Sequence, residues 1–262
     1  MRNVRRHAEK IFMVLFAAAL LAAPAFAQDA VYSLNVVGFQ KVAAVPTGLT
    51  FAGNPFESPD PELNSLISTQ LTAGASIAIA DKILKWDSDA QAYVKYYLRN
   101  NARAGVVNKW VLSTDEGVPT TNAFLNSDDG FFIQTVAAST QQVVMVGDVV
   151  NDSEISKSIP AALSMHSFPF SAPIAIKDMN LTNATAGASI AISDKLMVWD
   201  AAQQQYVKYY FRNNARAGVI NKWVAALDEG VETTDVINPN DGFWIQALSQ
   251  FQWVAKRPYT LD

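Results

Sequence analysis

The stretch that decides the fold is Tyr93–Val111, which reads YVKYYLRNNARAGVVNKWV and returns as Tyr206–Val224, YVKYYFRNNARAGVINKWV. The match runs without a gap from Gly74 to Thr121 at an offset of 113 residues, and 34 of these 48 positions are identical. A period of this length indicates a duplicated domain rather than a short solenoid unit. The sequence therefore predicts two homologous domains in tandem, related by pseudo-two-fold symmetry, and any surface site is expected twice.

The repeated stretch alternates as a half-buried β-strand does. Successive side chains of a strand point to opposite faces, so Val94, Tyr96 and Leu98 are expected in the core, and the residues between them in solvent. About seven such runs per repeat are typical of an antiparallel sandwich or barrel. The predicted fold is all-β, with two antiparallel β-sandwich or barrel-like domains. The strands expected in the first repeat are 34–42, 50–53, 82–86, 93–99, 106–112, 130–136 and 142–146, with a short helix at 63–71 and a weaker counterpart at 180–184.

The first 27 residues have the features of a secretory signal peptide. Four basic residues accompany an apolar run from Ile11 to Leu21, and Ala25-Phe26-Ala27 is a small-x-small cleavage sequence. The mature chain is expected to begin at Gln28 after general secretion, and to be secreted, periplasmic or bound at the cell surface. Its repeats are predicted at 28–147 and 148–262. No later run is apolar over about 18 residues, so no spanning helix is expected.

The mature chain is acidic and lacks cysteine. Without the signal peptide it has 16 Lys and Arg against 23 Asp and Glu, a net charge of −7. This charge argues against nucleic-acid binding, which needs a basic face. The absence of cysteine excludes disulfides, thiol nucleophiles and Cys/His zinc sites. We expect no cofactor.

Short phrases follow one another in a set order. In the first repeat they are Val37-Gly38-Phe39, Asn54-Pro55-Phe56, Lys85-Trp86-Asp87, Gly130-Phe131-Phe132 and Val146-Gly147-Asp148. The second repeat keeps Pro169-Phe170, Trp199-Asp200 and Gly242-Phe243-Trp244, but has Ser156-Lys157-Ser158 where the opening phrase would fall. This order resembles an uncharacterised family of secreted, β-rich repeat proteins of environmental bacteria. The resemblance implies export, repeated β domains and a non-enzymatic role, and it adds no site residues.

Few residues offer catalytic chemistry. His166 is the one histidine of the mature chain, so a Ser-His-Asp triad would have to use it, and a packed structural histidine is the favoured interpretation. The paired acids Asp115-Glu116 and Asp228-Glu229 each precede a glycine. Adjacent strand residues point to opposite faces, so neither pair alone would place two carboxylates across a cleft. Each pair is interpreted as a polar turn closed by the glycine. An enzyme that acts on polysaccharide through paired carboxylates stays an alternative.

Two acidic loops raise calcium binding as an alternative. Asp87 and Asp89 lie two residues apart, and Asn126, Asp128 and Asp129 precede a glycine. Neither loop matches a twelve-residue calcium loop, so solvated turns are expected and no metal site is predicted.

The duplicated block supplies the candidate binding residues. Tyr and Trp rings with amide and guanidinium groups suit sugar rings, and they also suit protein interfaces. Packing of the same aromatic residues in the core, or between the two repeats, is the structural alternative. The candidates are Tyr93, Lys95, Tyr97, Arg99, Asn100, Asn101, Arg103, Trp110, Tyr206, Lys208, Tyr210, Arg212, Asn213, Asn214, Arg216 and Trp223.

Together these features predict an exported, non-enzymatic surface or extracellular protein. It is expected to bind a polysaccharide or protein partner, or to build an assembly by self-association. An outer-membrane β-barrel is a further alternative, disfavoured because several of the expected strands are shorter than the roughly ten residues that such a barrel needs.

Overall fold

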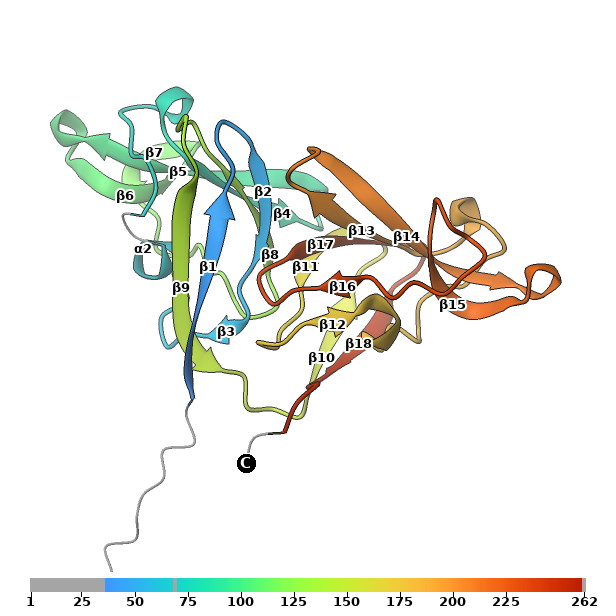
Figure 1. Ribbon diagram of the computed structural model, residues 1–262. Coiled ribbons are helices and arrows are strands. Elements are labelled where there is room, and N and C mark those ends of the chain that lie inside the picture. Colours follow the sequence, from blue (N-terminus) through green and yellow to red (C-terminus); the bar gives the residue numbers. More distant parts are fainter. Residues whose placement is uncertain (1–35, 68–69, 261–262) are drawn as a thin grey trace, which may run out of the picture. The chain divides into compact units, whose positions relative to one another are not determined.

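The computed structural model describes residues 36–67 and 70–260, which lie within one compact unit, Asn35–Asp262. Strands dominate this part of the chain, and its helices are one four-residue α-helix, α2 (Leu63–Leu66), and five single-turn 3-10 helices. Figure 1 shows the strands gathered into several sheets, and the sheet strands pair antiparallel. The predicted all-β antiparallel fold is confirmed. The predicted signal peptide, residues 1–27, lies outside the described residues.

The first repeat forms two sheets. A six-stranded sheet has the order β2-β8-β4-β5-β6-β7, and a three-stranded sheet has the order β1-β9-β3. The strands are β1 (Val37–Ala44), β2 (Leu49–Gly53), β3 (Phe56–Glu57), β4 (Lys82–Asp87), β5 (Ala92–Asn101), β6 (Val106–Leu112), β7 (Asp115–Pro119), β8 (Gly130–Gln134) and β9 (Gln141–Val149).

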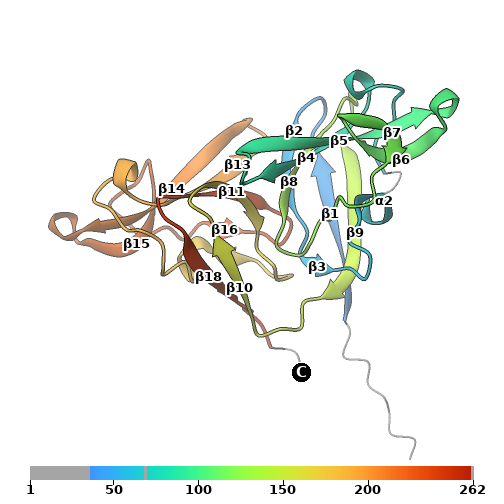
Figure 2. The same cartoon turned by 180° about the vertical axis from the view of Figure 1, so that it is seen from behind.

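The second repeat forms a five-stranded sheet, β11-β17-β13-β14-β15, and two strand pairs, β10-β18 and β12-β16. Figure 2 shows the β10-β18 pair from behind. The strands are β10 (Glu154–Ile159), β11 (Ala162–Ser167), β12 (Ile174–Ala175), β13 (Lys195–Asp200), β14 (Gln205–Asn214), β15 (Val219–Ala225), β16 (Val236–Ile237), β17 (Gly242–Ala247) and β18 (Phe251–Lys256).

The matched sequence blocks form matched local structures. Strand β5 and strand β14 each end in two asparagines and lead into a 3-10 turn, η2 (Ala102–Ala104) or η5 (Ala215–Ala217). The GASIAI phrases form two further turns, η1 (Ile77–Ile79) and η4 (Ile190–Ile192). The same residues thus produce the same backbone at both places. A last 3-10 turn, η3 (Ile176–Asp178), belongs to the second repeat.

The seven strands predicted for the first repeat correspond to β1, β2, β4, β5, β6, β8 and β9. Two predictions were wrong. The expected turn at Asp115-Glu116 begins β7, because this segment pairs with β6. The weaker helix predicted at 180–184 is absent from that described segment, where the chain makes turns. Asn180 has a φ of 59°, a left-handed conformation that a right-handed helix does not accommodate.

The first core lies between the six-stranded sheet and the β1-β9 pair. Alternate residues of β1 and β9 point inward and meet the inner face of the large sheet. Each large side chain buried in this way stabilises the fold by about 1.5–3 kcal/mol. The cluster includes Val42, Ala44, Ile83, Leu98, Trp110, Phe131, Ile133, Val143 and Met145.

The second core is built in the same manner. The β10-β18 pair covers one face of the five-stranded sheet, and Trp253 from β18 donates its indole N–H to the Met179 carbonyl at 2.7 Å. The cluster includes Ile159, Phe168, Phe170, Leu196, Phe211, Trp223, Phe243, Ile245, Phe251 and Trp253.

A third apolar cluster joins the two repeats. Phe51, Leu84 and Phe132 of the first repeat pack with Met165 and Trp244 of the second. The Phe51 ring lies 5.7 Å from the Trp244 ring, and the Phe132 and Phe51 rings are stacked at 4.3 Å. The outer face of each large sheet is therefore covered in part by the other repeat.

Several of the hydrogen bonds between the repeats come in reciprocal pairs. Trp86 donates its indole N–H to the carbonyl of Leu163 at 2.9 Å, and Trp199 donates to the carbonyl of Leu49 at 3.0 Å. The two backbone bonds are also reciprocal: Gly53 N–H donates to Asn240, and Ser167 N–H donates to Asp128. The two tryptophans tie the β4-β5 and β13-β14 hairpins to the other repeat, and the backbone bonds tie β2 and β11 to it.

His166 is a structural residue. Its ring is buried, with Nε2 2.8 Å from Ser164 Oγ, and it lies against the rings of Phe243 and Trp253. Burial, with a smaller contribution from the charge of Lys157, lowers the pKa of His166 well below its usual value. The ring is therefore neutral in the folded protein, as the structural interpretation of the sequence expected.

Stability is expected to fall as the pH drops below about 6.5, the pKa of histidine in an unfolded chain. The unfolded state binds a proton there that the folded state does not, so His166 costs up to about 1.4 kcal/mol of unfolding free energy per pH unit. Urea unfolding at pH 7.5 and 5.5 measures the loss. In the variant His166→Gln this component should vanish, and an unchanged pH dependence would contradict the assignment.

Candidate functional site

The hairpin end of the duplicated block lies at the contact between the repeats. Tyr93 packs edge-on against Trp86 at 5.0 Å and against Trp244 of the other repeat at 6.2 Å. Tyr206 packs against Trp199 at 4.8 Å and accepts a hydrogen bond from Trp244 Nε1 at 3.0 Å. Burial, with the neighbouring Tyr206 as a smaller cause, raises the pKa of Tyr93 to about 12. Tyr93 and Tyr206 therefore pack at the contact between the repeats. This packing is the alternative to ligand binding that the sequence left open.

The middle of the block is buried, so the predicted solvent face is wrong for Tyr97, Tyr210, Trp110 and Trp223. Tyr97 is enclosed by Ala80, Val106 and Val111, with Ile77 of η1 over it. Trp110 faces the first core and donates to the Ile67 carbonyl at 2.5 Å. Tyr210 and Trp223 have the same places in the second repeat. The alternation itself is present, but both faces of the strand are covered.

Arg99 and Arg212 were also predicted in solvent and are buried. Arg99 Nη1 donates to the backbone carbonyl of Glu116 and lies 3.7 Å from a carboxylate oxygen of the same residue. Arg212 makes the same contacts with Glu229. Each arginine thus holds the Asp-Glu-Gly (DEG) segment, residues 115–117 or 228–230, against its sheet.

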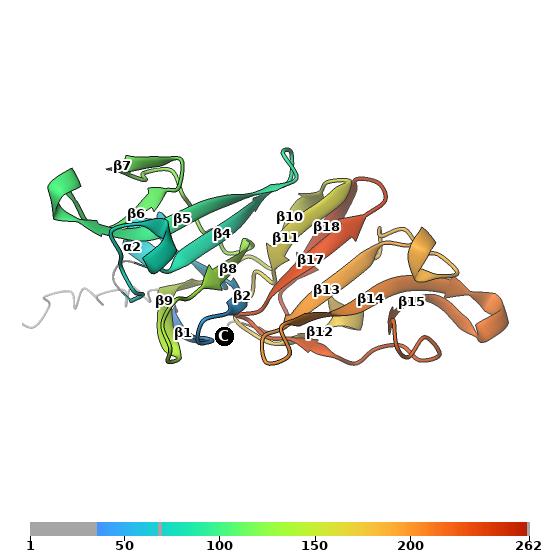
Figure 3. The ribbon, with the colours of Figure 1, turned by 90° about the horizontal axis from the view of Figure 1, so that it is seen from above.

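The far end of each block is exposed. Figure 3 shows each end as a hairpin that extends from its own sheet. Asn100 and Arg103 are exposed in the first repeat, as are Asn213 and Arg216 in the second. Lys95 and Lys208 are exposed further along the same strands. Of the sixteen candidates, these six and Tyr93, which is exposed by 38 % beside the contact between the repeats, keep surfaces that a ligand can reach.

The shape of each exposed end depends on only a few of its residues. Asn101 Oδ1 accepts a hydrogen bond from the Ala104 N–H at 3.2 Å, and Asn214 makes the same bond to Ala217. Gly105 has a φ of 74°, a conformation that glycine adopts at no steric cost. Arg103 and Arg216 make no hydrogen bond or ion pair with any other residue that the structure describes.

The acidic loops are closed turns. Asp129 accepts hydrogen bonds from the N–H and the side-chain amide of Asn126, and it lies 3.2 Å from Lys85 Nζ. Asp128 pairs with Lys157 of the second repeat at 2.5 Å. Asp87 accepts from two backbone N–H groups of its own turn. In the part of the chain that the structure covers, no three His, Asp or Glu side chains form a group that could hold a metal ion.

One surface was not predicted from the sequence as a site. Val37, Phe39 and Val146 are exposed by 65 %, 66 % and 50 %, and Phe39 stands directly opposite Val146 in the β1-β9 pair. Alternation places all three on the face turned away from the first core. The Val-Gly-Phe phrase was noted only as a mark of resemblance. The spacing of the phrase could have indicated this surface, because Val37 and Phe39 point to one face of the strand and Val42 points to the other.

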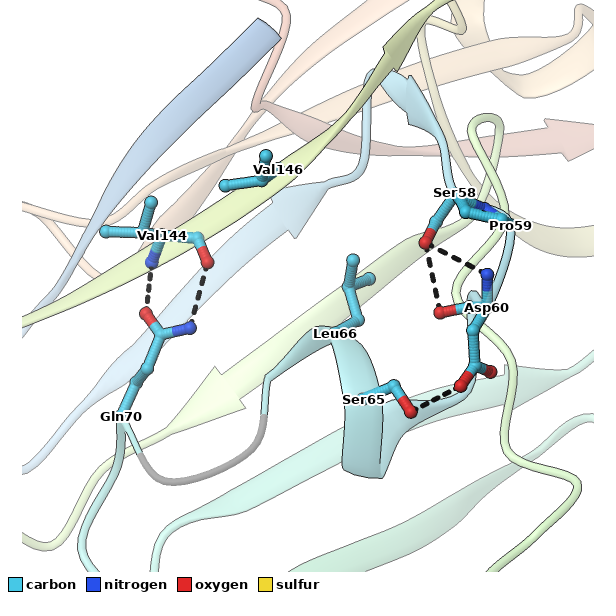
Figure 4. Close-up of a pocket in the computed structure, with 8 residues that line it drawn as sticks. All are labelled: Ser58, Pro59, Asp60, Ser65, Leu66, Gln70, Val144 and Val146. Carbon is cyan, nitrogen blue, oxygen red and sulfur yellow. Dashed lines mark hydrogen bonds between the residues drawn. The ribbon is translucent and has the colours of Figure 1, made fainter. Parts of the chain in front are cut away.

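A pocket of about 360 Å³ lies beside this surface, at the outer edge of β9 (Figure 4). The side-chain amide of Gln70 closes part of that edge by bonding both the N–H and the carbonyl of Val144. Ser65 donates to the Asp60 carboxylate at 2.5 Å, and Ser58 bonds the backbone of Asp60. The polar groups of the pocket are thus paired with each other, and none converges on a ligand.

Comparison with family models, curated proteins and solved structures gave no match. The resemblance to secreted repeat proteins therefore stays a prediction. Across residues 36–67 and 70–260, no helix has the length and apolar character needed to cross a membrane.

Proposed function

We propose that this is an exported, non-enzymatic protein that binds an acidic polysaccharide through the two exposed hairpin ends. The observation that supports this most directly is the pair Arg103 and Arg216. Both are exposed, both lack a partner among the described residues, and both stand in loops whose shape does not depend on them. A guanidinium group kept at both ends without a structural contact is available for a ligand.

The chemistry of each end suits carboxylate or sulfate groups. Arg103 in η2 offers a planar set of N–H donors, and Asn100, near the end of β5, offers an exposed side-chain amide. Lys95 lies near the other end of β5, so it adds positive charge to the strand but is not part of the Arg103 turn. The block's aromatic rings are buried or lie between the repeats, so stacking on a sugar ring is not part of this proposal. The ligand would be held by charge and hydrogen bonds.

Two ends on one molecule make weak sites effective. A long polymer that reaches both ends converts the second contact into an intramolecular one, which strengthens binding by about 10²–10⁴-fold. The reciprocal bonds between the repeats support a fixed pseudo-two-fold arrangement of two homologous domains. The non-enzymatic part of the proposal is supported by Asp128 and Asp129, whose side chains are engaged in a turn and in ion pairs.

Binding of the mature protein to an array of acidic and neutral polysaccharides tests this proposal. The wild-type protein is expected to bind the acidic polysaccharides of the array. This binding should disappear at about 1 M salt, where the Debye length is near 3 Å. Arg103→Ala or Arg216→Ala should weaken binding by about 100-fold through lost avidity, and the double variant should abolish it.

The matched control is Lys256→Ala, which removes an exposed positive charge outside the two ends. It should bind as wild type does. If no acidic polysaccharide is retained, or if the double variant binds as strongly as the control, the proposal is wrong.

A further inference from the structure

Strand β1 is the edge of its sheet, and at one end no hydrogen bond from another described residue reaches its outer side. Val149 N–H donates to the Val36 carbonyl, so the even-numbered residues of β1 bond to β9. The N–H and carbonyl groups of Val37, Phe39 and Lys41 therefore point away from the sheet. The Lys41 carbonyl confirms this direction, because it accepts from the Asn240 side chain on that side at 3.5 Å. Val37 and Phe39 keep outward backbone groups.

The exposed face at this edge is apolar, although the fold does not require it. Val37 and Phe39 are both about two-thirds exposed. In the second repeat, β10 pairs with β18 in the same way that β1 pairs with β9, but its exposed face carries Glu154, Ser156 and Ser158. Charged and polar residues are the usual protection of an edge strand. The second repeat has that protection along β10, whereas β1 has it only at Lys41 and lacks it at Val37 and Phe39.

We infer that β1 pairs with β1 of a second copy, antiparallel and centred on Gly38, so that the chain forms a two-fold dimer. In this register Val37 stands opposite Phe39 of the other copy, and Phe39 opposite Val37. The outward N–H and carbonyl groups of these residues then bond to each other across the two-fold axis. The two three-stranded sheets become one continuous sheet.

A second copy fits this edge better than another occupant because the strand is complementary to itself. Val37 and Phe39 of the two copies form one apolar patch across the axis, flanked by Val146 from each neighbouring strand. Pairs of an aromatic and a β-branched side chain are favourable cross-strand neighbours. Gly38 lies at the axis with the Phe56 ring beneath it, where a Cβ would come within 2.5 Å of that ring.

The free stretch is short, because Asn240 already occupies the Lys41 carbonyl. We therefore expect a dimer with a micromolar Kd rather than an obligate one. This inference does not use the hairpin ends, so it stands or fails separately from the polysaccharide proposal.

Sedimentation velocity of the mature chain tests the dimer over about 1–100 µM, the range in which such a Kd is populated. Wild type should shift from monomer to dimer. Phe39→Glu and Val37→Lys should each stay monomeric, because each places two charges in the patch. An equimolar mixture of the two variants should regain the dimer, since the register sets Lys at 37 against Glu at 39.

The matched control is Val118→Lys, a similarly exposed valine on β7, which should dimerise as wild type does. Circular dichroism confirms that all variants are folded. A monomeric wild type, a dimer that survives both substitutions, or a mixture without recovery would each overturn the inference. A monomer in which Val37 and Phe39 are protected from hydrogen exchange would show that residues 28–35 cover the edge instead.

Discussion

Replacing Tyr97 with alanine is expected to lower the free energy of unfolding by about 3–5 kcal/mol, the usual cost of removing a buried aromatic side chain. The ring is fully buried among Ala80, Val106 and Val111. The surrounding strand and 3-10 turn cannot close over the space without moving the Gly74 segment, which is bonded to β5. Urea unfolding followed by tryptophan fluorescence measures the loss. Tyr210→Ala should show the same cost, because Val219 and Val224 enclose that ring.

The variant Tyr97→Phe separates packing from hydrogen bonding. Among the residues that the structure describes, the buried Tyr97 hydroxyl has no hydrogen-bond partner at bonding distance, so its removal should change stability little. Lys95→Ala, two residues away and exposed, should likewise be nearly neutral. If Tyr97→Ala were as stable as wild type, the ring would have to lie in solvent, as the alternation alone predicted.

Gly130→Ala is expected to cost about 3 kcal/mol, at the upper end of the range for overpacked positions. A Cβ at this residue would lie 2.4 Å from the carbonyl oxygen of His166, which is backbone and cannot rotate away. Asp129 and His166 form a bridge there, and Ser167 N–H bonds Asp128 beside it at 3.0 Å. The substitution should therefore separate the two repeats locally. Thermal unfolding and urea unfolding both report the change.

Gly117→Ala is the matched control for this prediction. No atom lies within 4 Å of the position that its Cβ would take, so no clash arises. Its effect should be between zero and a stabilisation of about 1 kcal/mol, because alanine restricts the unfolded chain. Equal losses in the two variants would show that the close approach at Gly130 is relieved by other movements.

The sequence predicted the strands of the first repeat well because its alternation, turns and hydrophobic runs are local properties. The seven expected strands are present, with ends shifted by a few residues. Strand β7 was missed because its acidic DEG start suggests a turn, and only pairing with β6 makes it a strand. The helix expected at 180–184 was lost to the left-handed conformation of Asn180, a backbone angle that composition does not reveal.

The candidate site was harder to predict because alternation assigns two faces but does not say what covers each. Tyr97 and Arg99 point away from the first core, as expected, yet η1 and the DEG segment cover them. The Trp244 ring of the other repeat covers Tyr93 in part. Such coverage depends on contacts between residues far apart in the chain. The exposed apolar edge at Val37 and Phe39 was hidden for the converse reason, since valine and phenylalanine normally signal a core.

The reciprocal indole hydrogen bonds limit which substitutions the sequence of each repeat can accept. Trp86 depends on a carbonyl of the second repeat, and Trp199 depends on a carbonyl of the first. A substitution that moves Leu49 or Leu163 therefore acts on a tryptophan in the opposite half of the chain. Substitutions in one repeat at these contacts therefore constrain the sequence of the other repeat. Replacing one repeat with an unrelated domain would remove the carbonyl that the tryptophan of the other repeat bonds to. The coupling of the halves thus gives a physical reason for the retention of both hairpin tryptophans, although many residues around them differ between the repeats.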